Sequence, residues 1–243
     1  MHDPIESPPS PDAPPHSGGG HRAPWPRAAL AGVFFAWGIV GALWAMWPTD
    51  QIRYVFREQG GVENATVILY VLAALALPAA GIRRRMPGVS LLALIILMIA
   101  AAARELDLHK IVGDYSVFKI GFYLKSDIPL HQRLWAFTGV DLVLLSGLYV
   151  TIRHARSWWW NARSGEPWAG TVGTMMAAGA LAKVADRSAD VLSSWLGVQF
   201  PPSLAALIQA FEESTELLLP ALVILAVIQA ARRRAPVARL SAA

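Results

Sequence analysis

The residues best suited to chemistry in this chain are ionisable side chains that recur four positions apart. Three such pairs combine carboxylates or a carboxylate with an imidazole: Glu105 and His109, Asp186 and Asp190, and Glu212 and Glu216. A fourth pair, Lys183 and Arg187, carries positive charge. Side chains four residues apart lie on one face of an α-helix, so each pair can point at a single centre. Groups of these types can exchange protons, bind a metal ion or hold a charged headgroup.

Three further ionisable residues lie in or beside apolar sequence: Glu63, Arg104 and Asp141. Ionisable residues within a membrane normally face the interior of a helix bundle or a water-filled cavity. We therefore expect an outward-facing polar pocket to which the second, third, fifth and sixth apolar stretches contribute. Glu213 is the weakest candidate, because it cannot share a helical face with both Glu212 and Glu216, and we expect it to face water.

Composition places the chain in the membrane class. Of its 243 residues, 55% are hydrophobic and 16% are charged, against roughly 25% charged in soluble domains. The net charge of +4 arises from cations between apolar runs, so we expect no nucleic-acid partner. Cysteine is absent, which excludes disulfides, thiolate metal sites and a cysteine nucleophile.

The elements that must position these groups are six apolar stretches. Each has close to the length that a helix needs to cross a bilayer, about 20 residues. They are Ala28–Trp47, Val62–Gly81, Val89–Asp107, Leu134–Arg153, Trp168–Arg187 and Phe211–Ala231. The expected fold is an all-α, polytopic transmembrane bundle with six spans over residues 28–234. Residues 1–27, rich in proline and glycine, are expected to form a disordered tail, and residues 235–243 a short second tail.

The positive charges predict an orientation. Arginine triplets at 83–85 and 232–234 follow two of the spans, and twelve of the 21 Lys and Arg residues fall on one side of the expected bundle. Loops rich in Lys and Arg remain cytoplasmic, so both termini are predicted to be cytoplasmic in a bacterial inner membrane. The ionisable layer then lies near the outer surface.

Three hypotheses for this layer are open. In the first, the charges form an interhelical ion-pair network in a structural or accessory subunit with a membrane-protein partner. In the second, a divalent metal bound among Glu105, His109, Asp186, Glu212 and Glu216 serves a hydrolase or a lipid-modifying enzyme. In the third, partly desolvated carboxylates bind a proton, a cation or a polar headgroup, and Asp141 takes part in proton movement.

Overall fold

The computed structural model describes residues 25–57, 59–108, 116–124, 128–197 and 200–232, which form eight α-helices and no strand. The helices are α1 (Trp25–Met46), α2 (Thr49–Val55), α3 (Gly61–Arg84), α4 (Gly88–Glu105), α5 (Ile120–Leu124), α6 (Leu130–Arg163), α7 (Pro167–Leu196) and α8 (Pro202–Arg232). The expected all-α architecture is confirmed. The predicted tails fall almost wholly outside the described residues.

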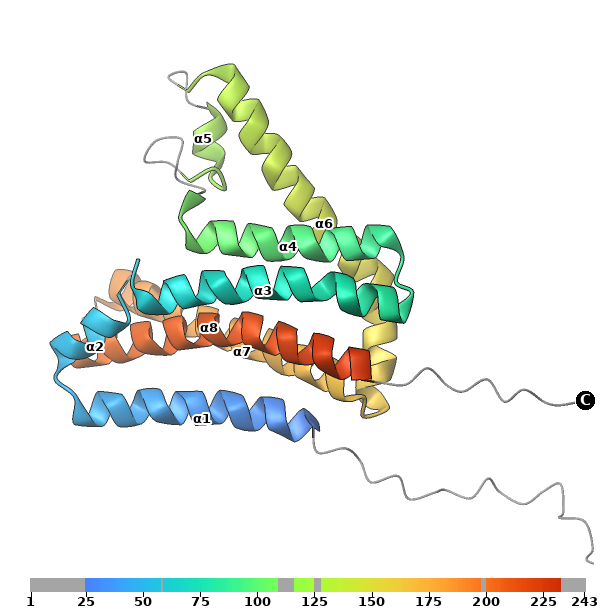
Figure 1. Cartoon of the computed structure of the whole chain (residues 1–243). Coiled ribbons are helices and arrows are strands. Elements are labelled where there is room, and N and C mark those ends of the chain that lie inside the picture. Colours follow the sequence, from blue (N-terminus) through green and yellow to red (C-terminus); the bar gives the residue numbers. More distant parts are fainter. Residues whose placement is uncertain (1–24, 58, 109–115, 125–127, 198–199, 233–243) are drawn as a thin grey trace, which may run out of the picture.

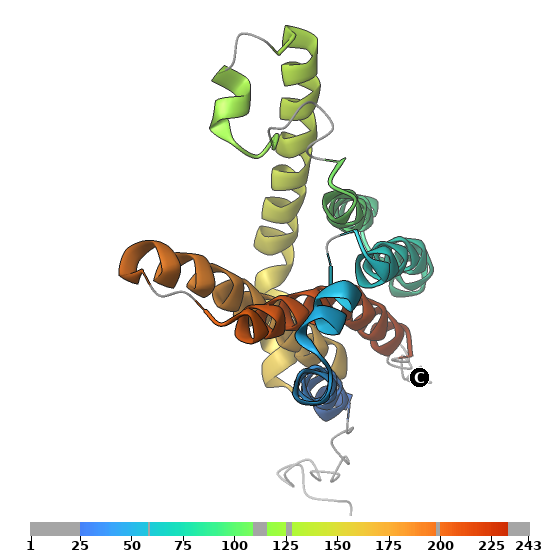
Figure 2. The same cartoon turned by 90° about the vertical axis from the view of Figure 1, so that its left-hand side faces the viewer.

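Helix α8 is the central element of the bundle. It packs against α7, α3, α1 and α2, and its contact with α7 is the most extensive between any two described helices. Figure 1 shows α1, α3, α4 and α8 side by side along the long direction of the bundle. Figure 2 views α1, α3 and α4 nearly end-on, so their axes are closely aligned. Groups at matching heights on these helices can therefore meet around α8.

Short connections hold neighbouring helices antiparallel. Helix α3 ends at Arg84. The next residue, Arg85, adopts a left-handed backbone conformation with φ of 50°, and Pro87 caps the start of α4. Gly81 lies against α4, because a Cβ atom there would be 3.1 Å from Cδ1 of Leu91. This close approach brings the whole of α4 alongside α3.

The short helix α2 covers the first part of α8. Its buried Ile52 and the following Phe56 pack with Ala206 and Ala210 of α8 and with Val40 of α1. Two side-chain donors add polar contacts to the start of α8: Nε1 of Trp44 donates to the carbonyl oxygen of Ser203, and Nη2 of Arg53 donates to that of Pro202. Helix α8 consequently begins beneath α2, nine residues before the predicted start of the sixth span.

Among the described residues, five helices are long and apolar enough to cross a membrane: α1, α3, α4, α6 and α8. Helix α7, the predicted fifth span, falls short because glycines, threonines and charged residues reduce its hydropathy. The glycines serve packing: a Cβ atom on Gly179 would be 3.5 Å from Cδ2 of Leu219 in α8, and one on Gly173 would be 3.4 Å from Cζ2 of Trp158 in α6. These features indicate a multi-pass membrane protein in which α7 is packed among other helices.

Helix α6 diverges from the bundle. Its principal contacts are with α4 and α7, and Figures 1 and 2 show its first half rising away from α3 and α4 with α5 beside it. Only 6% of the residues in its most apolar 18-residue stretch are buried, although the helix is 34 residues long. The observed helix extends beyond the predicted span, Leu134–Arg153, at both ends.

Candidate functional site

The glutamates of α8 lie well inside that helix. Glu212 follows the first helical residue, Pro202, by ten positions, which corresponds to roughly 15 Å along the axis. The sequence interpretation placed Glu212 and Glu213 at the mouth of the span, and this is corrected by the earlier start of α8. The apolar turns before Glu212 pack under α2 and the end of α1. The glutamates are thus level with the ends of α3 and α4 rather than with the start of their own helix.

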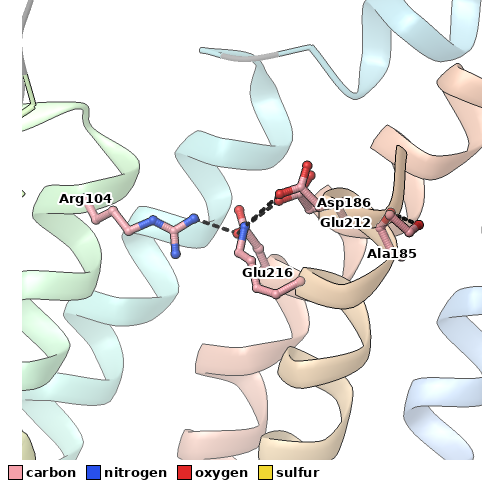
Figure 3. Close-up of polar contacts among 7 residues, drawn as sticks. Arg104, Ala185, Asp186, Glu212 and Glu216 are labelled. Carbon is pink, nitrogen blue, oxygen red and sulfur yellow. Dashed lines mark hydrogen bonds and ion pairs between the residues drawn. The ribbon is translucent and has the colours of Figure 1, made fainter. Parts of the chain in front are cut away.

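Glu216 is the hub of a charged cluster. It is buried, with 8% of its surface exposed, and its Oε1 atom accepts hydrogen bonds from two cations. Nη2 of Arg104 in α4 lies 2.8 Å from this oxygen, and Nζ of Lys183 in α7 lies 3.1 Å from it. Figure 3 shows Arg104 reaching Glu216 from one side, with Asp186 and Glu212 beyond it on the other. One carboxylate therefore joins three helices.

Lys183 extends the cluster along α7 and α8. Its Nζ donates to Oε1 of Glu212 at 2.5 Å and lies 4.0 Å from Oδ2 of Asp186. Its side chain is about half exposed, as is that of Arg104, whereas those of Glu212 and Glu216 are 20% and 10% exposed. The acids of the cluster are thus more buried than the bases that balance them.

A second, more acidic side of the cluster faces α3 and α4. Glu105 is buried with 9% of its surface exposed, and it forms no ion pair or hydrogen bond through its side chain to any other described residue. It is close enough to Glu216, Arg104 and Glu63 for their charges to interact. Glu213 interacts with Glu216, Glu63, Glu212 and Glu105 in the same way and is only partly exposed. The expectation that Glu213 simply faces water is therefore wrong.

Glu63 lies at the edge of this acidic side. It is the third residue of α3, and its Oε2 atom accepts a hydrogen bond from the backbone N–H of Gln59 in the preceding connection. This contact ties the connection from α2 to the start of α3. It also directs the carboxylate towards the end of the bundle that holds α2.

Two contributors to the site were missed by the sequence interpretation. Tyr70 of α3 is buried and lies within electrostatic range of Glu105, Glu216 and Arg104. Its spacing of seven from Glu63, two helical turns on one face, was the signal that could have found it. Nε1 of Trp37 in α1 donates to Oγ1 of Thr215 at 3.0 Å, beside Glu216. No spacing within either segment indicated this second contact.

Some predicted members do not join the cluster. Asp141 is exposed on α6, and Arg187 is exposed on α7; neither forms an ion pair with another residue in the described part of the chain. Asp141 was expected in the bundle because α6 was expected to lie parallel to the other spans, and α6 instead diverges from them. His109 lies outside the described residues, as does the side chain of Asp190.

The arrangement of acids bears on the metal hypothesis. Among the residues whose side chains the structure describes, no three carboxylate or histidine side chains converge to hold a metal ion. The carboxylates instead alternate with Arg104 and Lys183, which occupy the oxygen lone pairs that a metal would need. Among the described side chains, the geometry is therefore that of an ion-pair cluster.

The fold and the site define a class: an all-helical, multi-pass membrane protein with a charged cluster among its helices. Comparison with protein-family models, with curated proteins and with solved structures finds no match for the chain. The function is accordingly argued from the residues of the cluster alone.

Proposed function

We propose that the protein is a six-span inner-membrane protein that binds a proton, or a small cation in its place, in the cluster around Glu216. The observation that carries the proposal is an excess of acid. Six carboxylates, from Glu63, Glu105, Asp186, Glu212, Glu213 and Glu216, surround two cations, Arg104 and Lys183. Buried carboxylates without a paired cation are costly while ionised, so the cluster gains free energy by taking up positive charge.

Glu105 is the residue at which we place the bound charge. It is as buried as Glu216 but lacks the direct cationic partners that Glu216 has among the described residues. The neighbouring Tyr70 hydroxyl can donate to an ionised carboxylate or accept from a protonated one. Pro220, which is fully buried, has no N–H to donate to the carbonyl of Glu216, so that carbonyl oxygen is a further acceptor near the site.

The orientation follows from the two ends of the bundle. The ends of α3 and α8 opposite the cluster carry arginines (Figure 1). Arg83 lies in the last turn of α3, Arg85 follows that helix, and Arg232 is the last residue of α8. Arginine-rich ends remain cytoplasmic, which supports cytoplasmic termini and a cluster near the outer surface. The sixth span in this proposal is α7, whose charged residues are tolerated because α1, α6 and α8 pack against it.

The experiment is an infrared titration of the purified protein that counts protonated carboxyl groups against pH. We expect the wild type to hold at least one carboxyl protonated near neutral pH and the Glu105→Gln variant to hold one fewer. Asp50→Asn is the matched control, because Asp50 is an exposed carboxylate on α2, outside the cluster around Glu216. Identical titrations of wild type and Glu105→Gln would contradict the proposal.

A cation is separated from a proton by repeating the titration with sodium and with potassium. A cation that replaces the proton lowers the pH at which the carboxyl signal disappears, in wild type but not in Glu105→Gln. If salt has no effect on the wild-type titration beyond that seen with Asp50→Asn, the ligand is the proton alone.

A second candidate, a purely structural ion-pair network, is favoured by the short contacts of Arg104 and Lys183 with Glu216 and Glu212. These contacts join α4, α7 and α8, and such buried networks fix which helix faces meet. In this case exchange of the charges of Lys183 and Glu212 should preserve the fold, and no carboxyl should titrate near neutral pH.

A further inference from the structure

A cleft separates α4 from the first half of α6, at the place where Figure 1 shows these two helices diverging. It has a volume of about 370 Å³, within the range of small-molecule sites. Its walls come from the end of α4, from residues 117–118 and from α6. Small residues, Ala100 and Ala103 of α4 with Ala136 and Gly139 of α6, line much of it. A Cβ atom on Gly139 would meet no atom within 4 Å, so this stretch of α6 borders open space.

The cleft is mainly apolar, with two polar residues towards one end, where Leu108 and Phe118 also line the wall. Arg104, next to the last residue of α4, and Gln132, near the start of α6, contribute to the same end. Val140 and Val143 lie farther along α6; Val143 follows Gln132 by eleven positions, roughly 16 Å of helix. Because Arg104 is at the end of a candidate span, its end of the cleft lies at headgroup depth and the other end runs towards the bilayer centre.

Arg104 faces both the cluster and the cleft. Its Nη2 atom is bonded to Glu216, yet 48% of its side chain is exposed and the residue lines the cleft. A guanidinium carries five N–H groups in a fixed fork, and none of the others is bonded to a described residue. Arg104 therefore has further N–H donors that an anionic group can accept, and phosphate oxygens match the geometry of a guanidinium.

From this we infer that the cleft is a binding site for an anionic membrane phospholipid, with one acyl chain along Ala136, Gly139 and Val143 and the phosphate on Arg104. The N–H groups of Arg104 that no described residue accepts can donate to phosphate oxygens, and the mainly apolar walls of the cleft suit an acyl chain. Trp135, which is 77% exposed beside the cleft, is the type of residue enriched at headgroup depth. A helix of a partner protein, about 10 Å across, needs a wider groove than this volume offers. The site is separate from the carboxyl cluster and shares only Arg104 with it.

The test is native mass spectrometry of the full chain released from detergent, titrated with phosphatidylglycerol and with phosphatidylcholine of the same acyl chains. We expect wild type to retain phosphatidylglycerol about tenfold more strongly, as one charge-assisted contact allows. Gly139→Leu and Ala136→Leu, which fill the cleft, should lower the retention of phosphatidylglycerol about tenfold. Gly38→Leu is the matched control, because Gly38 also borders open space but lies on α1.

Arg104→Gln separates the headgroup from the chain: it should remove the preference between the two lipids while both are still retained. Thermal unfolding of each variant in detergent shows whether it is folded. Equal retention of the two lipids by wild type, or undiminished retention of phosphatidylglycerol by both cleft-filling variants, would overturn the inference. So would a change in the number of chains per particle in Gly139→Leu, which would assign the cleft to a second copy of the chain. The carboxyl titration is expected to be unchanged in Gly139→Leu, so the two proposals fail independently.

Discussion

Helices α6 and α7 follow each other in the chain and are of similar length, but they have opposite relations to the bundle. Helix α6 is apolar enough to cross a membrane, and only 6% of the residues in its most apolar 18-residue stretch are buried. Helix α7 fails the same criterion of hydropathy and yet packs against α1, α6 and α8. In a soluble protein the more apolar helix would be the more buried one. Here the helix that lacks a sufficiently apolar 18-residue stretch, α7, has more buried residues than α6.

The different burial of α6 and α7 follows from the way a bilayer solvates side chains. Lipid solvates apolar side chains as well as a protein interior does, so apolar sequence alone does not drive α6 into the bundle. Small residues let helices approach closely, and charged residues need partners that only other helices supply. Gly179 against Leu219 and Lys183 against Glu212 are the two kinds of contact that hold α7. The predictions below test whether these contacts, rather than hydropathy, place the helix.

The largest effect is expected from filling the contact between α7 and α8. Gly179→Leu adds a side chain where a Cβ atom alone would be 3.5 Å from Cδ2 of Leu219, and overpacking of this kind costs about 3 kcal/mol. Gly139→Leu on α6 makes the same chemical change where no atom lies within 4 Å and should leave stability within about 0.5 kcal/mol. The free energy of unfolding in detergent measures both. Equal losses would show that α7 is no more tightly packed than α6.

An intermediate effect is expected from the charges of the cluster. Lys183→Glu places a carboxylate against Glu212 and Glu216 and should destabilise by about 2 kcal/mol, since Lys183 is half exposed. Adding Glu212→Lys restores an opposite pair and should recover about 1 kcal/mol, measured as the coupling energy of the double-mutant cycle. Lys183→Arg keeps the charge and serves as the control. A double variant no more stable than Lys183→Glu alone would show that the pair adds nothing to the packing of α7 on α8.

Much of the fold could be predicted from the sequence because apolar runs and arginine triplets mark where spans lie. The ranges given for five of the six spans match observed helices that are apolar enough to cross a membrane. The ends were less accurate. Helix α8 begins at Pro202, since proline is well suited to the first turn of a helix, and its early residues are stabilised by Ile52 and Phe56 of α2. Contacts of this kind, distant in sequence, leave no pattern in the segment itself.

The sequence predicts how deep in the bundle the charged residues lie, but not which way their side chains point. The sequence analysis placed the ionisable residues of several spans in one layer near the outer surface, and the structure brings Lys183 and Glu216 to within 3.1 Å. How each helix is rotated about its axis depends on its neighbours. Glu213 therefore faces the acidic side instead of water, and Tyr70 joins the site although it lies two turns from Glu63.

The smallest effect is expected at Asp141, the charged residue in the middle of α6. Its side chain is exposed and forms no ion pair with another described residue, so Asp141→Asn removes no contact and should change the free energy of unfolding by less than about 0.5 kcal/mol. Unfolding in detergent measures this free energy. A loss of stability comparable to that of Lys183→Glu would show that Asp141 belongs to the charged interior and that α6, like α7, is held by polar contacts.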